Sequence, residues 1–500
     1  MQNYYYNLAG GLNTASTKTD LGIDTRKIYW SEAKNVEIFK NKGVTRQNGN
    51  VAVFNSPDNK AISGIFGYMI DGIEVLLYNC KSGELYYRDL VQNKDILVSS
   101  AIAKPENVTY TRYLTGVIIS DGVSDPLYFD HKTPTQLKPC KAKTALGVNI
   151  RGNAIASYKG RLWIAMGGTL YFSALGRYDD WTSPSDAGYI SNFLCDIDEI
   201  TALHPYKDYL AIYKKNTTFL LSGSTIQDFS IQQFADKGAL NQSMVLNVAN
   251  KQYFCSGSSV FTLEQAGILA QIALGSEVSL NVRPELAQYD YSSPYRGRAL
   301  YYERKNQIWF LYPTLGNMYL STALIYDYNN DAWTKREVPQ QITSATVLNG
   351  KIYTATADGK VLLEDSGHTF DGLNIDFVWK SPFFSLGEPN KRKCVEDFYF
   401  LLDDNFDNNF TFGTFKNYDN VFEDDLADIV TQDNDFLMWD SDMFFWSDDV
   451  QGNIWTNLTE GVYKSDITQS NYSVQLGIRG SNSDQNFALI GLEFKEVYYD

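Results

Sequence analysis

The sequence predicts an all-β protein, a β-propeller of six or seven blades followed by a β-sandwich-like C-terminal domain. Three observations support this fold class: a high aromatic content, hairpin turns at a nearly constant interval, and a change of pattern near residue 370. Tyr, Phe and Trp, with 35, 28 and 9 copies, make up 14% of the 500 residues. Aromatic side chains fit pleated, half-buried surfaces better than helices, so strands are the expected elements.

A degenerate unit recurs along the chain: an apolar strand, a two-residue polar turn, a second apolar strand, another turn and a third strand. One clear copy reads GIFGYMIDGIEVLLYNCKSGELYYRDL and has its first turn at Asp71-Gly72. A second copy, AIASYKGRLWIAMGGTLYFSAL, has turns at Lys159-Gly160 and Gly167-Gly168. Glycine supplies the positive φ that tight hairpin turns require, and the flanking Ile, Val, Tyr and Trp favour strands.

The spacing of the first turns identifies the repeat. The remaining first turns are expected at Thr115-Gly116, Lys207-Asp208, Asn250-Lys251, Lys305-Asn306 and Asn349-Gly350. The second residues of the seven turns follow one another at intervals of 44, 44, 48, 43, 55 and 44 residues. A period of about 40 to 50 residues with three or four short strands per unit is typical of propeller blades. An ordinary series of antiparallel meanders is the alternative. The long interval of 55 residues indicates an insertion, and either end of the chain could supply a strand that closes the circle.

The same patterns divide the chain into three parts. Residues 1–50 form an N-terminal arm with the first strands, residues 51–370 the propeller, and residues 371–500 the sandwich-like domain. The segments GLNIDFVWKSPFFSLGE, from Gly372, and YSVQLGIRGSNSDQNFALIGLEFKEVYY alternate apolar and polar residues as antiparallel strands do.

An acidic, aromatic insertion at residues 403–450 interrupts the last domain. It holds fourteen Asp and Glu residues against the single basic residue Lys416. The stretch Asp433 to Asp442 offers oxygen ligands for Ca²⁺ but lacks the glycine and the final glutamate that an EF-hand loop needs. A solvated acidic face is the preferred interpretation.

The charge balance restricts the choice of partner. With 43 Lys and Arg against 59 Asp and Glu, the formal net charge is −16. Tight binding of nucleic acid depends on Lys and Arg that displace counterions, so an acidic chain is a poor candidate for it. The N-terminus lacks the charged and apolar segments of a secretory signal, and no apolar run approaches the length of a membrane span. The five cysteines lie far apart, which predicts separate buried thiols in a reducing compartment.

No pattern of catalytic, cofactor-binding or metal-ligating residues is recognisable. The three histidines, His131, His204 and His368, stand outside any spacing that would place two nitrogens on one metal ion. Motifs of serine hydrolases, P-loop NTPases and dinucleotide enzymes are absent. The segment Asp179 to Ser183, with its Trp181-Thr182 pair, approaches the turn motif of sialidase propellers but lacks its order. The basic cluster Lys391 to Lys393 favours surface salt bridges over phosphate recognition.

Three short motifs near the N-terminus carry a family resemblance. They are Asn-Leu-Ala-Gly-Gly-Leu-Asn-Thr (Asn7 to Thr14), Glu-Ala-Lys-Asn-Val-Glu (Glu32 to Glu37) and Gly-Val-Thr-Arg-Gln-Asn-Gly (Gly43 to Gly49). Together with segments such as Gly160 to Ala165 and Ala323 to Thr334, they resemble the propeller-containing tail hub or nozzle proteins of short-tailed phages. This family includes tail tubular protein B and the packaged-DNA stabilisation proteins.

The resemblance implies a virion component made in the host cytoplasm. Such a protein forms a homo-oligomeric ring, commonly a hexamer, below the portal and its adaptor, and it forms or gates the channel through which DNA leaves. DNA then passes without sequence-specific binding, no membrane is crossed, and no cofactor or catalysis is involved. We further expect residues 403–450 to line the lumen or a subunit interface, where replacing several Asp by Asn should slow ejection or alter assembly.

Two other functions stay open on the sequence. A receptor-binding tail propeller would recognise host-surface carbohydrate, with aromatic residues between Trp439 and Trp455 stacking on sugar rings. A propeller glycosidase would use a pair of carboxylates, which glycosidases place on either side of the scissile bond.

Overall fold

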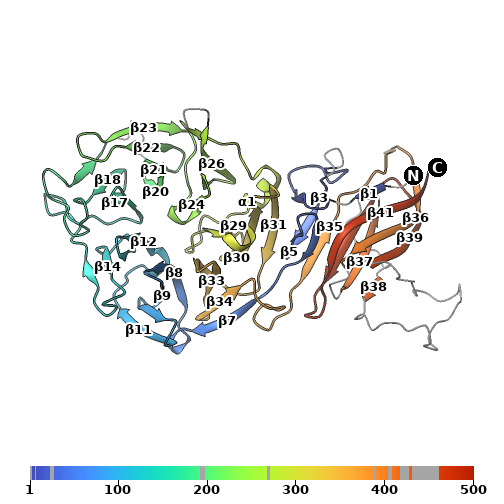
Figure 1. The fold of residues 1–500 in the computed structure, drawn as a ribbon, viewed down its shortest axis with the longest axis horizontal. Coiled ribbons are helices and arrows are strands. Elements are labelled where there is room, and N and C mark those ends of the chain that lie inside the picture. Colours follow the sequence, from blue (N-terminus) through green and yellow to red (C-terminus); the bar gives the residue numbers. More distant parts are fainter. Residues whose placement is uncertain are drawn as a thin grey trace. The chain divides into compact units, whose positions relative to one another are not determined.

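The computed structural model describes residues 3–5, 7–22, 27–191, 198–266, 271–387, 390–403, 408–416, 427–430 and 461–499 (Figure 1). Its contacts divide the chain into two compact units. One unit contains residues 51–324 and 338–364, and the other contains residues 1–50, 325–337 and 365–500. We call them the propeller unit and the terminal unit.

Seven four-stranded sheets follow one another in a circle and form the blades of a propeller (Figure 1). The strands of blades 1 to 4 are β8 (Ile62–Ile70), β9 (Ile73–Cys80), β10 (Leu85–Asp89), β11 (Lys94–Ser99), β12 (Thr109–Tyr113), β13 (Gly116–Ser120), β14 (Leu127–Phe129), β15 (Lys138–Pro139), β16 (Ala154–Tyr158), β17 (Arg161–Met166), β18 (Thr169–Phe172), β19 (Gly188–Ile190), β20 (Ile200–Tyr206), β21 (Tyr209–Lys214), β22 (Thr218–Ser222) and β23 (Ser230–Ala235). Those of blades 5 to 7 are β24 (Val245–Val248), β25 (Lys251–Ser256), β26 (Ser259–Ala266), β27 (Gln271–Leu274), β28 (Arg298–Tyr302), β29 (Gln307–Thr314), β30 (Asn317–Asp327), β31 (Ala332–Glu337), β32 (Ile342–Leu348), β33 (Lys351–Thr356), β34 (Lys360–Glu364) and β7 (Asn50–Asn55). The predicted propeller fold is confirmed, with seven blades.

The second strand of each blade shows why these segments read as continuous apolar runs. All five residues of β13 are buried, as are five of the six residues of β17 and of β21. A propeller sheet is covered on both faces by its neighbours, so its central strands lose the alternation of a half-exposed strand. The outer strands β11 and β23 contain no more than one buried residue each, because they lie at the rim.

The circle is closed by a strand from the N-terminal side of the propeller. β7 lies beside β34 and completes blade 7, whose other strands come from the end of the repeat region. Blades 7 and 1 are also joined at their innermost strands: the Ile65 amide donates to Ser344 Oγ at 3.1 Å and the Gly67 amide to Thr346 Oγ1 at 2.9 Å. Because the circle is closed in this way, the first and last blades pack against each other and are not left with exposed faces.

The predicted turns are the hairpins between the first and second strands of the blades. Turns at Asp71-Gly72, Lys159-Gly160, Lys207-Asp208 and Asn349-Gly350 are confirmed, and the first residue of each has a positive φ near 50°. The Gly167-Gly168 turn of blade 3 is confirmed too, between Met166 and its partner Thr169. The loop of blade 6 is longer than predicted, since Tyr302 pairs with Gln307 and four residues lie between them.

Two turns are displaced by one residue from the prediction. Blade 2 turns at residues 114 and 115, since Tyr113 pairs with Gly116. Blade 5 turns at residues 249 and 250, since Val248 pairs with Lys251. Gly116 is therefore a strand residue, and a Cβ there would lie 2.2 Å from the carbonyl oxygen of Phe129. Close approach of the neighbouring strand, and not a turn, requires glycine at this position.

The 55-residue interval contains an insertion between blades 5 and 6. Between β27 and β28 the chain forms the short elements η4 (Leu280–Val282) and α1 (Arg283–Leu286), then an irregular segment up to Gly297. The other one-turn elements are η1 (Pro57–Asn59), η2 (Pro105–Asn107), η3 (Gln242–Met244) and η5 (Glu303–Lys305).

The terminal unit contains two sheets built from both ends of the chain. The first has the order β39-β36-β41-β6-β5, with β1 also beside β41, and the second has the order β38-β37-β40-β35-β4. Their bounds are β1 (Asn3–Tyr5), β4 (Glu32–Lys34), β5 (Val36–Phe39), β6 (Gly43–Arg46), β35 (Phe377–Lys380), β36 (Lys393–Leu402), β37 (Asn409–Lys416), β38 (Ala427–Val430), β39 (Gly461–Asn471), β40 (Val474–Gly480) and β41 (Ala488–Tyr499); β2 (Gly11–Leu12) and β3 (Tyr29–Trp30) form a short parallel pair. The sequence division treated residues 1–50 separately, whereas four of their strands belong to these two sheets.

Aromatic side chains fill the space between the two sheets. Phe400 of β36 contacts Phe410 and Phe412 of β37, with ring centroids 6.1 and 5.5 Å apart. All three rings are nearly inaccessible to solvent. The sandwich-like core predicted for the C-terminal part is thus formed by interleaved aromatic rings.

The cysteines that the structure describes are separate buried thiols, as predicted. Cys80, Cys140 and Cys255 are free, and burial raises the pKa of Cys80 and Cys255 to about 12. Cys195 and the side chain of Cys394 lie outside the described residues. Among the described residues, no helix has the length and apolar character needed to cross a bilayer.

One ion pair in blade 1 gives a pH-dependent contribution to stability. Lys60 Nζ lies 2.7 Å from Glu84 Oε1. Hydrogen bonds from Lys60 and then Ser82 lower the pKa of Glu84 from 4.5 to about 2. A carboxyl with a lowered folded-state pKa stabilises the fold above its unfolded pKa, and this contribution disappears as the pH falls through the folded value.

We therefore expect Glu84→Gln to lower the thermal midpoint of unfolding near neutral pH. The difference from the wild type should shrink as the pH falls from about 4.5 toward 2. Thermal unfolding of both proteins across this range checks it, and Lys60→Gln, which removes the other partner, should behave in the same way. A difference that stays constant with pH would assign the effect to packing instead.

Candidate functional site

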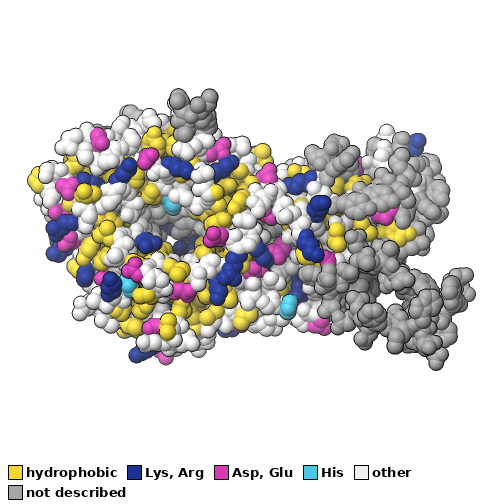
Figure 2. Space-filling view, viewed as in Figure 1, with side chains coloured by type: hydrophobic (Ala, Val, Ile, Leu, Met, Phe, Trp, Pro, Cys, Tyr) yellow, Lys and Arg dark blue, Asp and Glu magenta, His cyan; other side chains and the backbone are white. Residues whose placement is uncertain are grey.

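The propeller unit is hollowed at its centre. A cavity of about 590 Å³ opens where the innermost strands of several blades begin. Figure 2 shows this hollow, with Lys and Arg side chains visible inside it. Its lining comprises Lys104, Glu106, Asn107, Gly122, Arg151, Gly152, Asn153, Ala154, Ala165, Met166, Gly167, Glu199, Ile200, Thr201, Leu240, Asn241, Tyr289, Tyr291, Ser293, Pro294 and Arg296. Small-molecule sites in proteins have volumes of about 300–1,000 Å³, so the cavity has the size of a ligand site.

A second, much smaller space adjoins the cavity. Its volume is about 10 Å³, and it shares Glu106, Asn107, Asn241 and Arg296 with the larger cavity. Arg298, at the start of β28, lines this smaller space. A space of this size holds about one water molecule. The cavity is therefore a cup whose narrow end is surrounded by polar side chains.

Two arginines and one glutamate, Glu106, are the charged residues that line the narrow end. Arg296 lines both spaces and Arg298 the smaller one, and in the described part of the chain neither forms an ion pair with an acidic residue. Arg298 Nε is buried and has no hydrogen-bond partner among the described residues. Burial lowers the pKa of both guanidinium groups, and the positive charge of Arg296 contributes to a pKa of about 10 for Arg298. Both groups are charged at neutral pH.

The wider part of the cup has mixed charge and two aromatic rings. Lys104 and Arg151 line it, but so do Glu106 and Glu199. Arg151 already pairs with Asp125, at 2.9 Å. Tyr289 and Tyr291 come from the insertion between blades 5 and 6, and their ring centroids are 4.8 Å apart.

Hydrogen bonds from neighbouring blades fix the walls of the cup. Gln242 donates to the carbonyl oxygens of Ile155 (3.2 Å) and Leu203 (2.8 Å), and it accepts from the Leu203 amide at 2.8 Å. Its side-chain amide thus replaces a backbone link between the inner strands of blades 3 and 4. Such bonds hold the wall in one arrangement, because a half-buried amide that lost these partners would be destabilising.

The carboxylate of Asp121 orders the opposite wall. It accepts hydrogen bonds from the amides of Ala103 (3.0 Å) and Lys104 (3.2 Å) and from those of Val123 and Ser124. Burial acts to raise the pKa of Asp121, but these hydrogen bonds outweigh it, and the pKa lies below its ordinary value. Asp121 therefore holds the segment that carries Lys104 and Glu106 at the cavity.

The histidines considered from the sequence are not brought together. His131 lies 3.8 Å from Asp130 in blade 2, and His204 lies 3.1 Å from Gln252 Nε2 across blades 4 and 5. His368 belongs to the terminal unit, near Arg46. Burial lowers the pKa of His204 below its ordinary value. Each histidine has a separate structural environment.

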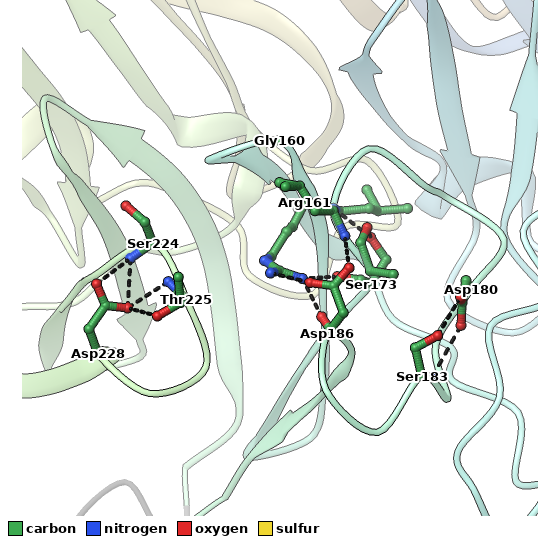
Figure 3. A network of polar contacts seen from close by, with 12 residues as sticks. Gly160, Arg161, Ser173, Asp180, Ser183, Asp186, Ser224, Thr225 and Asp228 are labelled. Atoms are coloured by element: carbon green, nitrogen blue, oxygen red, sulfur yellow. Dashed lines mark hydrogen bonds and ion pairs between the residues drawn. The ribbon is translucent and has the colours of Figure 1, made fainter.

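The segment that approached a sialidase motif has a structural role. Trp181 is buried and donates through Nε1 to the carbonyl oxygens of Cys140 and Tyr178. Asp180 accepts from the amide and hydroxyl of Ser183, at 3.2 and 2.7 Å, and closes the turn (Figure 3). A similar loop in blade 4 is closed by Asp228, which accepts from Thr225.

The basic and acidic segments singled out from the sequence contribute no site in the described residues. Lys391 and Arg392 are exposed, and the Arg392 guanidinium lies 5.5 Å from the centre of the Tyr472 ring. Most of the insertion at residues 403–450, including Asp433 to Asp442, lies outside the described residues, as does the segment from Trp439 to Trp455.

The second and third N-terminal motifs meet within the terminal unit, where the Gln47 amide donates to the Asn35 carbonyl at 2.9 Å. Asn35, with φ of 55°, donates to the Asp376 carbonyl and accepts from the Glu337 amide, both at 2.8 Å. Arg46 donates to the Gln485 carbonyl at 2.6 Å. Gly49 is required because a Cβ there would lie 1.8 Å from the carbonyl oxygen of Thr369. Arg336 adds two further hydrogen bonds, which it donates to the carbonyl oxygens of Asn48 (2.7 Å) and Gly49 (3.1 Å).

Sequence reasoning did not identify the cavity residues. Arg296 and Arg298 stand in no recognised motif, and their partners in the wall come from blades far apart in the chain. The 55-residue interval was the available signal, because the insertion that it contains supplies Tyr289, Tyr291 and Arg296 to the cup.

Comparisons with known proteins find similarity only among solved structures, at 10–11% identity and with TM-scores of 0.38–0.40. No protein-family model matches the chain, and no curated protein matches it. A chain of the mitotic checkpoint complex is 10% identical with a TM-score of 0.39, and the match covers 64% of this chain and 90% of that one. BamB from Moraxella catarrhalis is 11% identical with a TM-score of 0.38, and the match covers 67% and 96%. The WD40 β-propeller domain of Doa1 is 10% identical with a TM-score of 0.40, and the match covers 63% and 96%. Its seven four-stranded blades identify the protein as a β-propeller protein.

Proposed function

We propose that this protein is a structural component of a phage tail, a nozzle or hub subunit that assembles as a homo-oligomeric ring below the portal and its adaptor. One observation carries the proposal: three motifs that resemble those of tail hub and nozzle proteins occur in order along the first 50 residues. Two of their side chains, Asn35 and Arg46, donate hydrogen bonds to the carbonyl oxygens of Asp376 and Gln485, near the other end of the chain. The proposed role is mechanical and involves no catalysis.

The dimensions of the cavity restrict how such a subunit could conduct DNA. The central cup of about 590 Å³ narrows to a space of about 10 Å³. Duplex DNA, whose major groove alone is about 12 Å wide, is too large for it. The proposed DNA channel therefore lies between copies of the protein in the ring, with each propeller in its wall.

The net charge of −16 is compatible with that role. A negative surface repels phosphates and would lower the friction on DNA that leaves the particle. A closed propeller also presents broad loop faces to its neighbours and few free strand edges, which suits a subunit under mechanical load.

The test is native mass spectrometry combined with negative-stain imaging of the purified protein, alone and mixed with the portal–adaptor complex of its phage. We expect a six-fold ring with a central hole, either from the protein alone or on the adaptor. A monomer or trimer that ignores the adaptor would overturn the proposal. Binding on a glycan array would then favour a receptor-binding propeller, and activity lost with one carboxylate pair would favour a glycosidase.

A further inference from the structure

The narrow end of the central cup holds two positive charges, of Arg296 and Arg298, against the single negative charge of Glu106. Arg296 and Arg298 both line it, and within the described residues neither pairs with a carboxylate. The acidic residues of the lining, Glu106 and Glu199, form no ion pair with either arginine. Buried charges in proteins are ordinarily paired, because removal from water is costly unless an opposite charge compensates it. Arg298 is half-buried with a buried, unpartnered Nε, whereas Arg296 is exposed at the same end of the cavity. The unpaired Arg298 therefore favours an anion from outside the chain as its counter-charge.

The two arginine side chains together suit the binding of an anion. Each guanidinium presents several N–H donors in a fixed fork that matches the oxygens of a phosphate or carboxylate. The pKa of Arg298 is lowered to about 10 by burial and by the positive charge of Arg296, despite a favourable effect of Tyr110. An anion bound between them would remove this repulsion and satisfy the buried Nε of Arg298.

The rest of the cup indicates what the anionic group is attached to. The wider part has room for more than a simple ion, and the rings of Tyr289 and Tyr291 lie at its wall. Tyr291 is 65% exposed, so its ring is available for stacking. Glu199 lines this wider part and Glu106 lines both spaces, and these carboxylates would repel a second negative charge. The cup therefore suits a molecule with one compact anionic end and one flat, uncharged end.

We propose that the centre of the propeller binds a small organic anion, whose phosphate or carboxylate group contacts Arg296 and Arg298 and whose ring packs on Tyr291. The site is independent of ring assembly, because every residue that lines it belongs to the propeller unit of one chain. In an acidic protein, this basic cup would concentrate a ligand that the outer surface repels.

Isothermal titration calorimetry on the full-length protein tests the proposal with three probes: phenyl phosphate, benzoate and inorganic phosphate. We expect phenyl phosphate or benzoate to bind, and the tighter of the two identifies the anionic group. Arg298→Met should weaken binding of every probe by about tenfold or more, because each charged hydrogen bond contributes substantially to affinity. Tyr291→Ser should weaken the two ring-bearing probes and leave inorganic phosphate unchanged.

The matched control is Arg177→Met, which removes the same charge from the surface of blade 3, where Arg177 pairs with Asp179. Its binding should equal that of the wild type. Arg296→Met provides a second test at a more exposed position, should Arg298→Met fail to unfold cooperatively. The proposal is overturned if no probe binds to the wild type at millimolar concentration, or if a folded arginine variant binds as tightly as the wild type.

Discussion

Replacing Trp163 by alanine should lower the free energy of unfolding of the propeller unit by about 3–5 kcal/mol, the ordinary cost of deleting a buried aromatic side chain. Trp163 lies on β17, the second strand of blade 3, and has no solvent-exposed surface. Its ring centroid is 4.9 Å from that of Phe172 and 5.3 Å from that of Phe229. Blades 3 and 4 pack together through this cluster.

The size of the effect follows from what the indole contributes. Its removal leaves a cavity among rings that cannot all move inward, because they lie on hydrogen-bonded strands. It also removes the hydrogen bond from Trp163 Nε1 to the Tyr158 carbonyl, at 3.1 Å.

Denaturant unfolding, followed by fluorescence and circular dichroism, measures the loss. Trp163→Phe should retain more than half of the stability that alanine removes, because a ring still fills most of the site. Val91→Ala, at a side chain that is 95% exposed, is the control and should change little. A Trp163→Ala protein within about 1 kcal/mol of the wild type would contradict the packing described for blades 3 and 4.

Replacing Arg161 by methionine should destabilise the propeller unit by about 2–4 kcal/mol, because it breaks a largely buried charged network. Figure 3 shows this network in blade 3. Arg161 donates to the Ser173 carbonyl at 3.0 Å and to Asp186 Oδ1 at 2.5 Å, and it also bonds the Asp186 carbonyl. The Arg161 side chain is 4% exposed. Asp186 accepts from the Leu175 amide as well, so one residue orders the loop before β19.

Methionine keeps the aliphatic volume of arginine but supplies no donor, so the carbonyl oxygens of Ser173 and Asp186 lose a partner. Arg177→Met is the matched comparison in the same blade, because Arg177 pairs with Asp179 at 3.3 Å on the surface. A surface pair contributes about 0–1 kcal/mol. In thermal and denaturant unfolding, Arg161→Met should therefore lose clearly more stability than Arg177→Met. Equal losses of stability would show that the buried network contributes no more than the surface pair.

The propeller was predictable because its signal is local. A two-residue turn at positions such as Lys159-Gly160 and the apolar runs beside it specify a hairpin without knowledge of the rest of the chain. The turns of blades 2 and 5 were misplaced by one residue for the same reason. Leu114 and Ala249 adopt a positive φ that local preference disfavours, because strand pairing on either side imposes it.

The central cup was not predictable, because it depends on closure of the circle. Asn107, Asn241 and Arg298 lie more than 50 residues apart in sequence and meet only when the blades surround one axis. Likewise, nothing in residues 1–50 indicates that β1 lies beside β41, at the opposite end of the chain. Pairings of this kind are set by the whole fold and leave no mark on sequence spacing.

The strand that closes blade 7 has a consequence for the order of events during synthesis. β7 leaves the ribosome before every blade, but its partner β34 follows almost the whole propeller. Until then β7 has no place in a sheet, and the inner edge of β8 lacks the side chains of Ser344 and Thr346. The entropy cost of bringing such distant segments together grows only slowly with the length of chain between them, so closure of the propeller remains favourable. It cannot occur, however, until β34 has been synthesised. Nascent chains that end before residue 360 should therefore be open arcs with unpaired edges, prone to association with one another.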